Sequence, residues 1–208
     1  MQLSTSKRLR LGKNPVFIYD RHMNHNIKSP IEIATTDSDR EKCKALINKF
    51  FPESQSVLSK GYHLISHENC TKELLREDRE LFMLHDPISK NLIGTVLLTL
   101  GEKRQSFACI QYLITHPNFR NLGHGRCLLE HAENRAIQHG KKEIYISVVY
   151  HPKFPAEADE LVKFYTKRGY EEKRELERSP NPEESVGFAT EYRNDVRMKW
   201  LRKSLANN

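Results

Sequence analysis

Leu113-Ile114-Thr115-His116-Pro117-Asn118-Phe119-Arg120-Asn121-Leu122-Gly123-His124-Gly125-Arg126 is the most informative segment of this 208-residue chain. It begins as the end of an apolar strand, which Pro117 closes, and a helical pattern starts near Gly125. Glycines before a helix let the backbone approach a ligand closely, and the helix adds the positive end of its dipole. The segment therefore predicts an anion-binding loop, although a Gly-x-Gly pair alone also fits an ordinary strand-to-helix turn.

Two common phosphate-binding loops are excluded by the residues present. A dinucleotide-binding fingerprint would have a third glycine where Leu128 stands. A nucleoside-triphosphate loop would need Gly-Lys-Ser or Gly-Lys-Thr, which the sequence lacks. Any anion bound at this loop is therefore expected to belong to another class of ligand.

Strand and helix patterns alternate on both sides of the loop. Alternating or continuous apolar residues predict strands over residues 31–34, 81–84, 92–100, 107–115, 142–149, 170–176 and 196–201. Helical spacing predicts helices from residues 37–39 to about 51, near 72–77, from 125 to about 137 and over 155–168. An antiparallel run followed by strand–helix–strand units predicts a mixed α/β (α+β) domain, with one central sheet and helices on its faces.

The charge lies mainly at the two ends of the chain. The formal net charge is +7, yet residues 1–30 contribute +5 and residues 192–208 contribute +4. A nucleic-acid-binding protein usually carries a basic stripe across its fold, so solvated basic ends are favoured, and nucleic-acid binding by these ends is the weaker alternative. We expect residues 1–29 to form a basic N-terminal extension and residues 30–208 to form the domain.

Composition predicts a protein of the cytoplasm. The longest apolar run, over residues 92–100, is far shorter than the roughly 18 residues of a membrane-spanning helix, so we expect no membrane partner. The N-terminal region lacks the apolar core of a signal peptide. The four cysteines are widely spaced without a Cys-x-x-Cys pair, which favours reduced thiols: Cys43, Cys70, Cys109 and Cys127.

Two motifs resemble those of the GNAT superfamily of N-acetyltransferases. Arg120-x-x-Gly123-x-Gly125 after a strand is similar to the acetyl-CoA-binding motif of that family. The segment over residues 163–170, Lys-Phe-Tyr-Thr-Lys-Arg-Gly-Tyr, is similar to its helix-ending Phe-Tyr-x-x-x-Gly-Phe motif, with Tyr170 in place of Phe. Residues 198–201 look like the closing strand. The resemblance covers about residues 30–203 and implies a mainly antiparallel central sheet.

The resemblance also implies a site for acetyl-CoA as co-substrate. Backbone N–H groups of residues 121–126 would hold the pyrophosphate, with the charge of Arg120 beside it. The strand over residues 113–115 would diverge from its neighbour and offer main-chain groups to the pantetheine arm and the thioester carbonyl. The cofactor-binding residues expected on this basis are Leu113, Ile114, Thr115, Arg120, Asn121, Leu122, Gly123, His124, Gly125 and Arg126.

Tyr165 is the expected catalytic residue. Transfer of an acetyl group to an amine needs a proton for the departing thiolate, and a phenol with an ordinary pKa of about 10 stays protonated near neutral pH. Spacing alone favours a core tyrosine, because Ala158, Leu161, Val162 and Tyr165 form a helical stripe. The family motif instead favours the catalytic role.

The general base is not identified by the sequence. Many family members have Glu near the position of Cys109, so that base is missing. The substitutes are His63, His116, His151 and Glu157, or loss of the proton through water. His63 and His67 have the spacing of a metal pair without a third ligand, so we assign no metal. Ala158 stands where relatives often have an Asn that contacts the cofactor.

The resemblance therefore implies an acetyl-CoA-dependent N-acetyltransferase, in which a primary amine attacks the thioester directly. A small-molecule amine is the first choice of acceptor, and a protein N-terminus or lysine is the second. A domain that binds acyl-CoA without turnover is the rival from another class. Acceptor specificity is expected from residues 50–75, 150–157 and 178–190, and a homodimer is compatible with the sequence.

Overall fold

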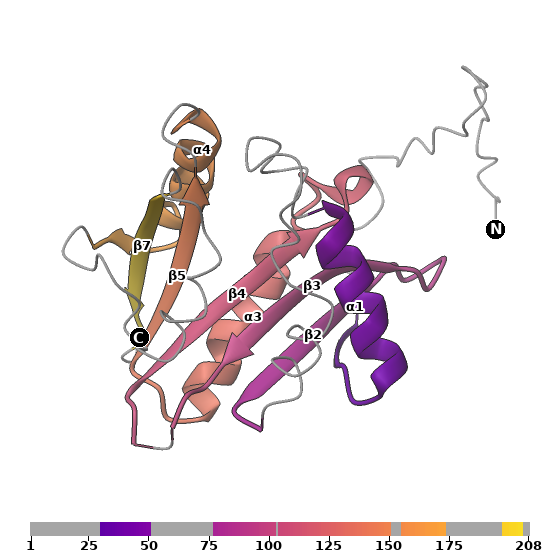
Figure 1. Ribbon diagram of the computed structural model, residues 1–208, viewed down its shortest axis with the longest axis horizontal. Helices are drawn as coiled ribbons and strands as arrows, with labels where there is room; N and C mark the ends of the chain where they lie inside the picture. Colours follow the sequence, from indigo (N-terminus) through magenta and orange to yellow (C-terminus); the bar gives the residue numbers. More distant parts are fainter. Residues whose placement is uncertain (1–29, 51–76, 103, 151–154, 174–196, 206–208) are drawn as a thin grey trace, which may run out of the picture.

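The computed structural model describes residues 30–50, 77–102, 104–150, 155–173 and 197–205. These residues form one seven-stranded sheet in the order β1-β2-β3-β4-β5-β7-β6 (Figure 1). The strands are β1 (Ile31–Ile33), β2 (Arg79–His85), β3 (Leu92–Thr99), β4 (Phe107–Thr115), β5 (Glu143–Tyr150), β6 (Glu171–Glu172) and β7 (Arg197–Ser204). Only β4 and β5 pair in parallel, so the predicted mixed, mainly antiparallel sheet is confirmed.

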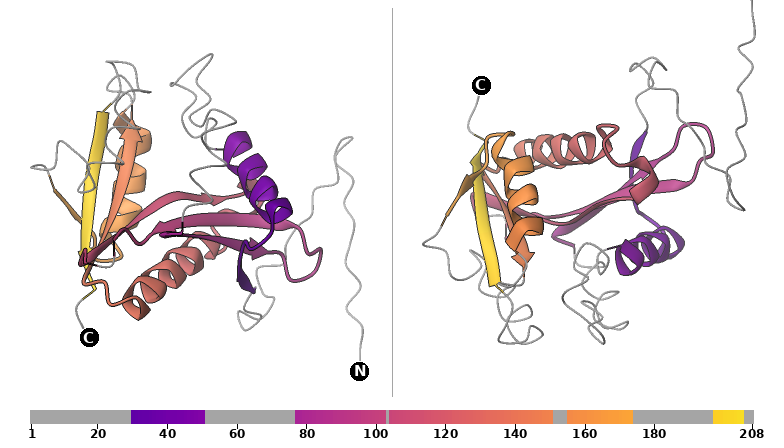
Figure 2. Two further views of the ribbon diagram at one scale, coloured as in Figure 1. Left: turned by 60° about the horizontal axis from the view of Figure 1, so that its bottom comes forward. Right: turned by 90° about the horizontal axis from the view of Figure 1, so that it is seen from above.

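In the described part of the chain three α-helices cover the two faces of the sheet, and the prediction of helices on its faces is confirmed (Figure 2). The helix α1 (Asp37–Phe50) packs on one face, where Cys43, Ile47 and Phe50 are buried against residues of β2, β3 and β4. The helices α3 (His124–Gln138) and α4 (Pro155–Thr166) pack on the other face. Leu128, Leu129 and other apolar residues of α3 are buried there with Tyr165 of α4. The two clusters together hold the sheet between helical layers.

The first helix, α1, is capped by the residue before it. Thr36 Oγ1 accepts a hydrogen bond from the Asp39 N–H at 3.1 Å. The same hydroxyl donates to Asp39 Oδ2 at 2.7 Å, which completes a reciprocal capping arrangement. Asp39 thus stabilises the first turn from inside the helix.

The predicted hairpin over residues 81–100 is confirmed, and its turn is held by one carboxylate. Antiparallel pairing of β2 and β3 runs from Arg79 opposite Thr99 to His85 opposite Leu92. In the turn, Asp86 Oδ2 accepts hydrogen bonds from the Ser89 N–H and hydroxyl, at 2.9 and 2.6 Å. Asp86 is buried although it is charged, and these bonds compensate part of its lost hydration.

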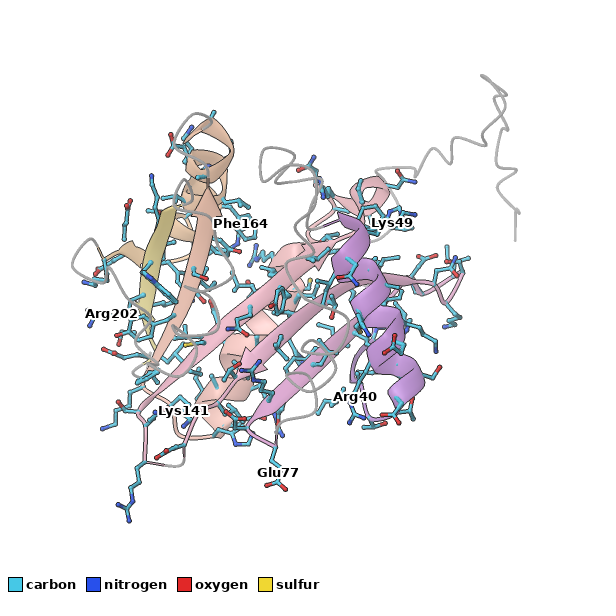
Figure 3. The ribbon with its side chains drawn as sticks, in the orientation of Figure 1. Arg40, Lys49, Glu77, Lys141, Phe164 and Arg202 are labelled. Atoms are coloured by element: carbon cyan, nitrogen blue, oxygen red, sulfur yellow. The ribbon has the colours of Figure 1, made fainter. Side chains whose placement is uncertain are left out.

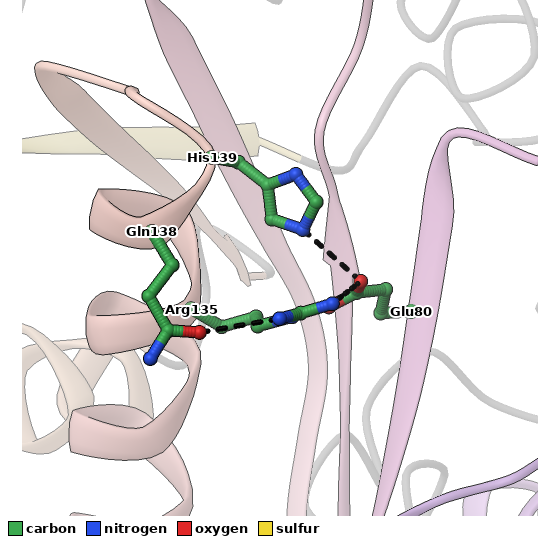
Figure 4. A network of polar contacts seen from close by, with 4 residues as sticks. All are labelled: Glu80, Arg135, Gln138 and His139. Atoms are coloured by element: carbon green, nitrogen blue, oxygen red, sulfur yellow. Dashed lines mark hydrogen bonds and ion pairs between the residues drawn. The ribbon is translucent and has the colours of Figure 1, made fainter.

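An ion-pair network joins β2 to the C-terminal end of α3 (Figure 4). Arg135 donates from Nε and Nη2 to the two carboxylate oxygens of Glu80, each at 2.7 Å, and His139 Nε2 lies 3.2 Å from one of them. Burial raises the pKa of Glu80, but the hydrogen bonds and charges of Arg135 and His139 outweigh it, so the net shift is downward. This bidentate pair holds the C-terminal end of α3 against β2.

The C-terminal end of α4 differs slightly from the predicted one. α4 ends at Thr166 instead of Arg168, because the N–H groups of Arg168 and Gly169 turn back to the carbonyls of Tyr165 and Thr166, at 2.8 and 3.0 Å. Gly169 follows with a φ of +86°, a conformation that glycine adopts without steric cost. Residues 72–77, where a further helix was expected, lie almost wholly outside the described part of the chain.

Candidate active site

A β-bulge in β4 shapes the edge of the candidate site. Thr95 of β3 lies opposite Ile114, whereas Leu97 lies opposite Gln111, so β4 contains one extra residue over this interval. Tyr112, within the bulge, has a φ of +50°, which is uncommon for a residue with a side chain. A bulge bends and twists its strand and often lies beside an active site. The sequence carried no signal of it, because no glycine or asparagine marks the position.

Beyond this point β4 and β5 separate (Figure 1). Their parallel pairing runs only from Phe107 opposite Glu143 to Ile110 opposite Ile146. β4 then continues to Thr115 in contact with β3, and β5 continues to Tyr150 in contact with β7. The main chain of Leu113, Ile114 and Thr115 therefore lies on a strand that has left its β5 ladder, while the side chain of Ile114 is buried against α1.

The predicted anion-binding loop connects this diverging strand to α3. A 3₁₀ turn over Pro117–Phe119 comes first, and then Asn121 and Gly123 adopt positive φ values of 63° and 87°. Gly123 caps α3 without a side-chain acceptor, and Cys127 N–H donates to the Gly123 carbonyl at 3.0 Å. The N–H groups of residues 124–126 precede this first turn and have no acceptor within the helix. The arrangement presents main-chain donors and the positive helix end at one place, as an anion requires.

The basic side chains of the loop differ in their orientation. Arg120 donates from Nε to the Thr115 carbonyl at 3.2 Å, which holds its guanidinium beside the end of β4. Arg126 pairs with Glu130 at 2.6 Å along the surface of α3. Burial lowers the pKa of His124, and the carboxylate of Asp86 only partly opposes this shift, so the imidazole is neutral at pH 7. Leu122 is exposed. Arg120 is thus the loop cation best placed to add charge at the site.

The two sequence motifs meet at Gly125. A Cβ at this glycine would lie 3.4 Å from Thr115 Oγ1 and 3.9 Å from Phe164 Cζ. Phe164 comes from α4, so the end of β4, the start of α3 and the last turn of α4 converge here; Figure 3 labels Phe164 beside α4. The place of Phe164 beside Tyr165 in the second motif is the one signal in the sequence that points to this residue.

Tyr165 follows Phe164 and is enclosed by the protein. Its side chain is 7% exposed and packs edge-on against Phe164 and Tyr170, at ring-centroid distances of 5.1 and 5.7 Å. Burial raises the pKa of the Tyr165 phenol, while the charge of Arg168 acts in the opposite direction. The hydroxyl therefore stays protonated at neutral pH and can donate its proton or a hydrogen bond. Of the helical stripe expected around it, Ala158 is buried, but Leu161 is exposed.

Of the four proposed substitutes for the general base, only His116 has a described side chain. Cys109 is buried in a cluster with Tyr145 and Trp200, on a sheet position where many family members would have a carboxylate. His116 Nδ1 accepts a hydrogen bond from the Asn118 N–H at 3.3 Å, and its ring packs against Phe50. A neutral imidazole that accepts at Nδ1 carries its proton on Nε2, so this geometry disfavours His116 as a base.

Several expected residues lie outside the described part of the chain. These are His63, His67 and His151, most of the predicted specificity regions 50–75 and 178–190, and the side chain of Glu157. Within the described residues, no group of three His, Cys, Asp or Glu side chains is arranged to hold a metal ion. No helix in that same part of the molecule is long and apolar enough to cross a membrane.

Comparison with known proteins gives the same assignment as the motifs. The model of the acetyltransferase (GNAT) family matches residues 41–170, more than half of the chain and the whole candidate site. A comparison with curated protein sequences found no match.

Solved structures share the fold at low sequence identity. An acetyltransferase of the GNAT family from Staphylococcus aureus is 17% identical, with a TM-score of 0.59, covering 85% of this chain and 99% of its own. Spermidine N-acetyltransferase from Vibrio cholerae, in complex with CoA and spermine, is 18% identical, with a TM-score of 0.60 and coverages of 85% and 95%.

An aminoglycoside 6′-N-acetyltransferase complexed with coenzyme A is 14% identical, with a TM-score of 0.60 and coverages of 86% and 98%. Likeness at these identities concerns the fold, whereas the family model also covers both motifs and the loop between β4 and α3. The family match, the diverging β4 and β5 strands and the glycine loop at the start of α3 agree, and the chain therefore belongs to the GNAT family of acetyltransferases.

Proposed function

We propose that this acetyltransferase transfers the acetyl group of acetyl-CoA to a primary amine by direct attack of the amine on the thioester. The observation that carries the proposal is the separation of β4 from β5 after Ile110 and Ile146, directly before the loop at the N-terminus of α3. An extended ligand with an anionic end fits this arrangement. Main-chain groups along β4 would bind its extended part, and the N–H groups of the loop would bind its anionic end. The acyl group that acetyl-CoA supplies is already activated as a thioester.

The loop and the end of β4 would bind the coenzyme. N–H groups over residues 121–126 would donate to the pyrophosphate, with the guanidinium of Arg120 beside them. The main chain of Leu113, Ile114 and Thr115 would pair with the pantetheine arm and polarise the acyl carbonyl. Donors that are fixed by a folded strand need no reorganisation during the reaction, which is the main advantage of such stabilisation.

Tyr165 would supply a proton or hydrogen bond to the leaving sulfur. Its raised pKa keeps the phenol protonated, and its place in α4 next to Phe164 puts it one residue from the side chain that reaches Gly125. Because Cys109 replaces the carboxylate that relatives often carry on β4, we infer that the amine loses its proton to water, or to one of the groups outside the described residues.

A small-molecule amine is the acceptor class that we propose. The spermidine and aminoglycoside acetyltransferases that share this fold are named for acceptors of that class. A protein N-terminus or a lysine side chain is the alternative acceptor. These alternatives differ in the size of the molecule that carries the amine, so a panel of acceptors separates them.

A thiol-release assay with acetyl-CoA tests the proposal. The panel holds polyamines, amino acids, aminoglycosides and short peptides with a free N-terminus or an internal lysine, and each reaction is compared with one that lacks the amine. We expect amine-dependent release with at least one small-molecule class. Release with peptides alone would replace our acceptor class by the alternative one. Binding of acetyl-CoA without release from any amine would favour a non-catalytic acyl-CoA-binding domain and contradict the proposal.

A further inference from the structure

Phe164, in the last turn of α4, and Arg168, in the turn that follows this helix, form a stacked pair. The Arg168 guanidinium carbon lies 3.7 Å from the centroid of the Phe164 ring, and Nη1 donates to the Phe164 carbonyl at 2.5 Å. The ring and the carbonyl of Phe164 together restrain the position of the guanidinium.

This pair lies beside the anion-binding loop. The tip of the Phe164 ring is 3.9 Å from the position of a Cβ at Gly125, the second residue of α3. Arg168 stacks on that same ring, and its charge also acts on the neighbouring phenol of Tyr165. The guanidinium is thus separated from the start of α3 by one aromatic ring and from the proposed proton donor by a short distance.

The charge of Arg168 has no acidic partner among the described residues. Other cations of α3, α4 and β7 are neutralised: Arg126 by Glu130, Lys163 by Glu160, Lys199 by Asp159 and Lys203 by Glu133. Arg168 is half-buried, and its enclosed Nε lacks a hydrogen-bond partner within the described part of the chain. A partly desolvated guanidinium without a carboxylate is costly unless an anion binds to it.

We infer that Arg168 binds the 3′-phosphate of coenzyme A and so makes this enzyme selective for the 3′-phosphorylated nucleotide end of its co-substrate. The pyrophosphate would occupy the main-chain donors of the loop, and Arg168 is a separate donor one ring away from them. A guanidinium that stacking holds in place suits a charge-assisted hydrogen bond to a phosphate. This inference rests on the proposed function, because it requires coenzyme A at the loop.

Isothermal titration with CoA and with 3′-dephospho-CoA tests the inference. The wild-type protein should bind CoA about tenfold more tightly than 3′-dephospho-CoA, which corresponds to one charge-assisted contact. Arg168→Met should bind the two ligands about equally, close to the wild-type affinity for 3′-dephospho-CoA. Arg168→Lys should recover part of the discrimination, since it keeps the charge without the planar geometry.

The control is Lys163→Met, which removes an exposed cation from the same helix and should keep the full discrimination. The ratio of the two affinities is measured within one variant, so a partly destabilised Arg168→Met protein still gives a valid answer. Equal binding of both ligands by the wild type, or full discrimination by Arg168→Met, would overturn the inference and leave the proposed function intact. Absence of CoA binding to the wild type would instead remove the proposed function itself.

Discussion

The hydroxyl of Thr115 lies 3.4 Å from the point where a Cβ of Gly125 would stand. The last residue of β4 and the second residue of α3 thus lie close together at the two ends of the loop, and glycine at residue 125 leaves space between them. Because Phe164 approaches the same point from α4, a side chain at residue 125 would meet two walls of the candidate site.

Gly125→Val should weaken the binding of acetyl-CoA by at least about tenfold, because the added methyl groups would enter the space between Thr115 and Phe164. Gly125→Ala should have a smaller effect in the same direction. Isothermal titration measures both affinities, and circular dichroism shows whether the variants fold. Wild-type affinity in the folded valine variant would mean that the coenzyme does not lie against Gly125.

Gly123→Ala should lower the stability of the protein without a steric clash at the candidate site. The φ of Gly123 is +87°, and no atom lies within 4 Å of the position of a Cβ there. A residue with a side chain loses about 1–2 kcal/mol in this conformation. Chemical denaturation should therefore show a lower free energy of unfolding, while the affinity for acetyl-CoA falls less than in Gly125→Val. A larger loss of affinity than in the valine variant would disprove this division of roles.

Tyr165→Phe should lower kcat at least about tenfold and leave the affinity for acetyl-CoA unchanged, since it removes only the phenol hydroxyl and keeps the ring. Tyr170→Phe is the matched control, because its ring packs edge-on to Tyr165 and the family motif has Phe at this position. Thiol release and titration separate kcat from affinity. Unchanged turnover in Tyr165→Phe would remove this residue from the mechanism.

The sequence predicted the regular elements better than the irregular ones. Apolar alternation located β4 with its observed bounds, Phe107–Thr115, and the start of α3 within one residue. The bulge at Tyr112 was not predictable, because tyrosine is a common strand residue and the extra residue becomes visible only in the pairing with β3. The sequence therefore predicted the position of β4 but not its register against β3.

In the candidate site too, local motifs could be predicted from the sequence, whereas contacts between distant segments could not. The glycine loop and Tyr165 were predicted from motifs, and the family match spans both. The stacking of Arg168 on Phe164 and the approach of Phe164 to Gly125 depend on how α4 lies against α3. Such contacts between distant segments leave no periodic pattern in the sequence, so neither residue could be assigned a role before the fold was known.

Arg135→Met should lower the free energy of unfolding at pH 7 by roughly 1–3 kcal/mol, because it leaves a partly buried carboxylate on Glu80 without its bidentate partner. The folded pKa of Glu80 lies below its usual value of 4.5, so the pair stabilises the protein above that pH and its contribution is lost as the pH falls through the lowered pKa. Urea denaturation of both proteins at several pH values should show the difference shrinking in acid. A difference that does not depend on pH would contradict the ion-pair account.

His131 should make the fold sensitive to mild acid. Burial first, and the charge of Arg135 second, lower its pKa below 6.5, and its ring packs at 4.7 Å on Phe82. The unfolded chain therefore takes up the proton first, and the stability present above pH 6.5 is lost as the pH falls towards the lowered pKa. His131→Gln should lose less stability than the wild type between about pH 7.5 and pH 5.5. Parallel loss in the two proteins would show that His131 does not contribute to the acid sensitivity.

The most direct measurement of the central claim is isothermal titration of acetyl-CoA into the full-length protein, with Gly125→Val titrated in parallel. The account predicts one binding site with a Kd between roughly 1 μM and 1 mM, weakened in the variant. A folded wild-type protein that shows no heat of binding over this range would contradict the assignment of the β4–α3 loop as the coenzyme site.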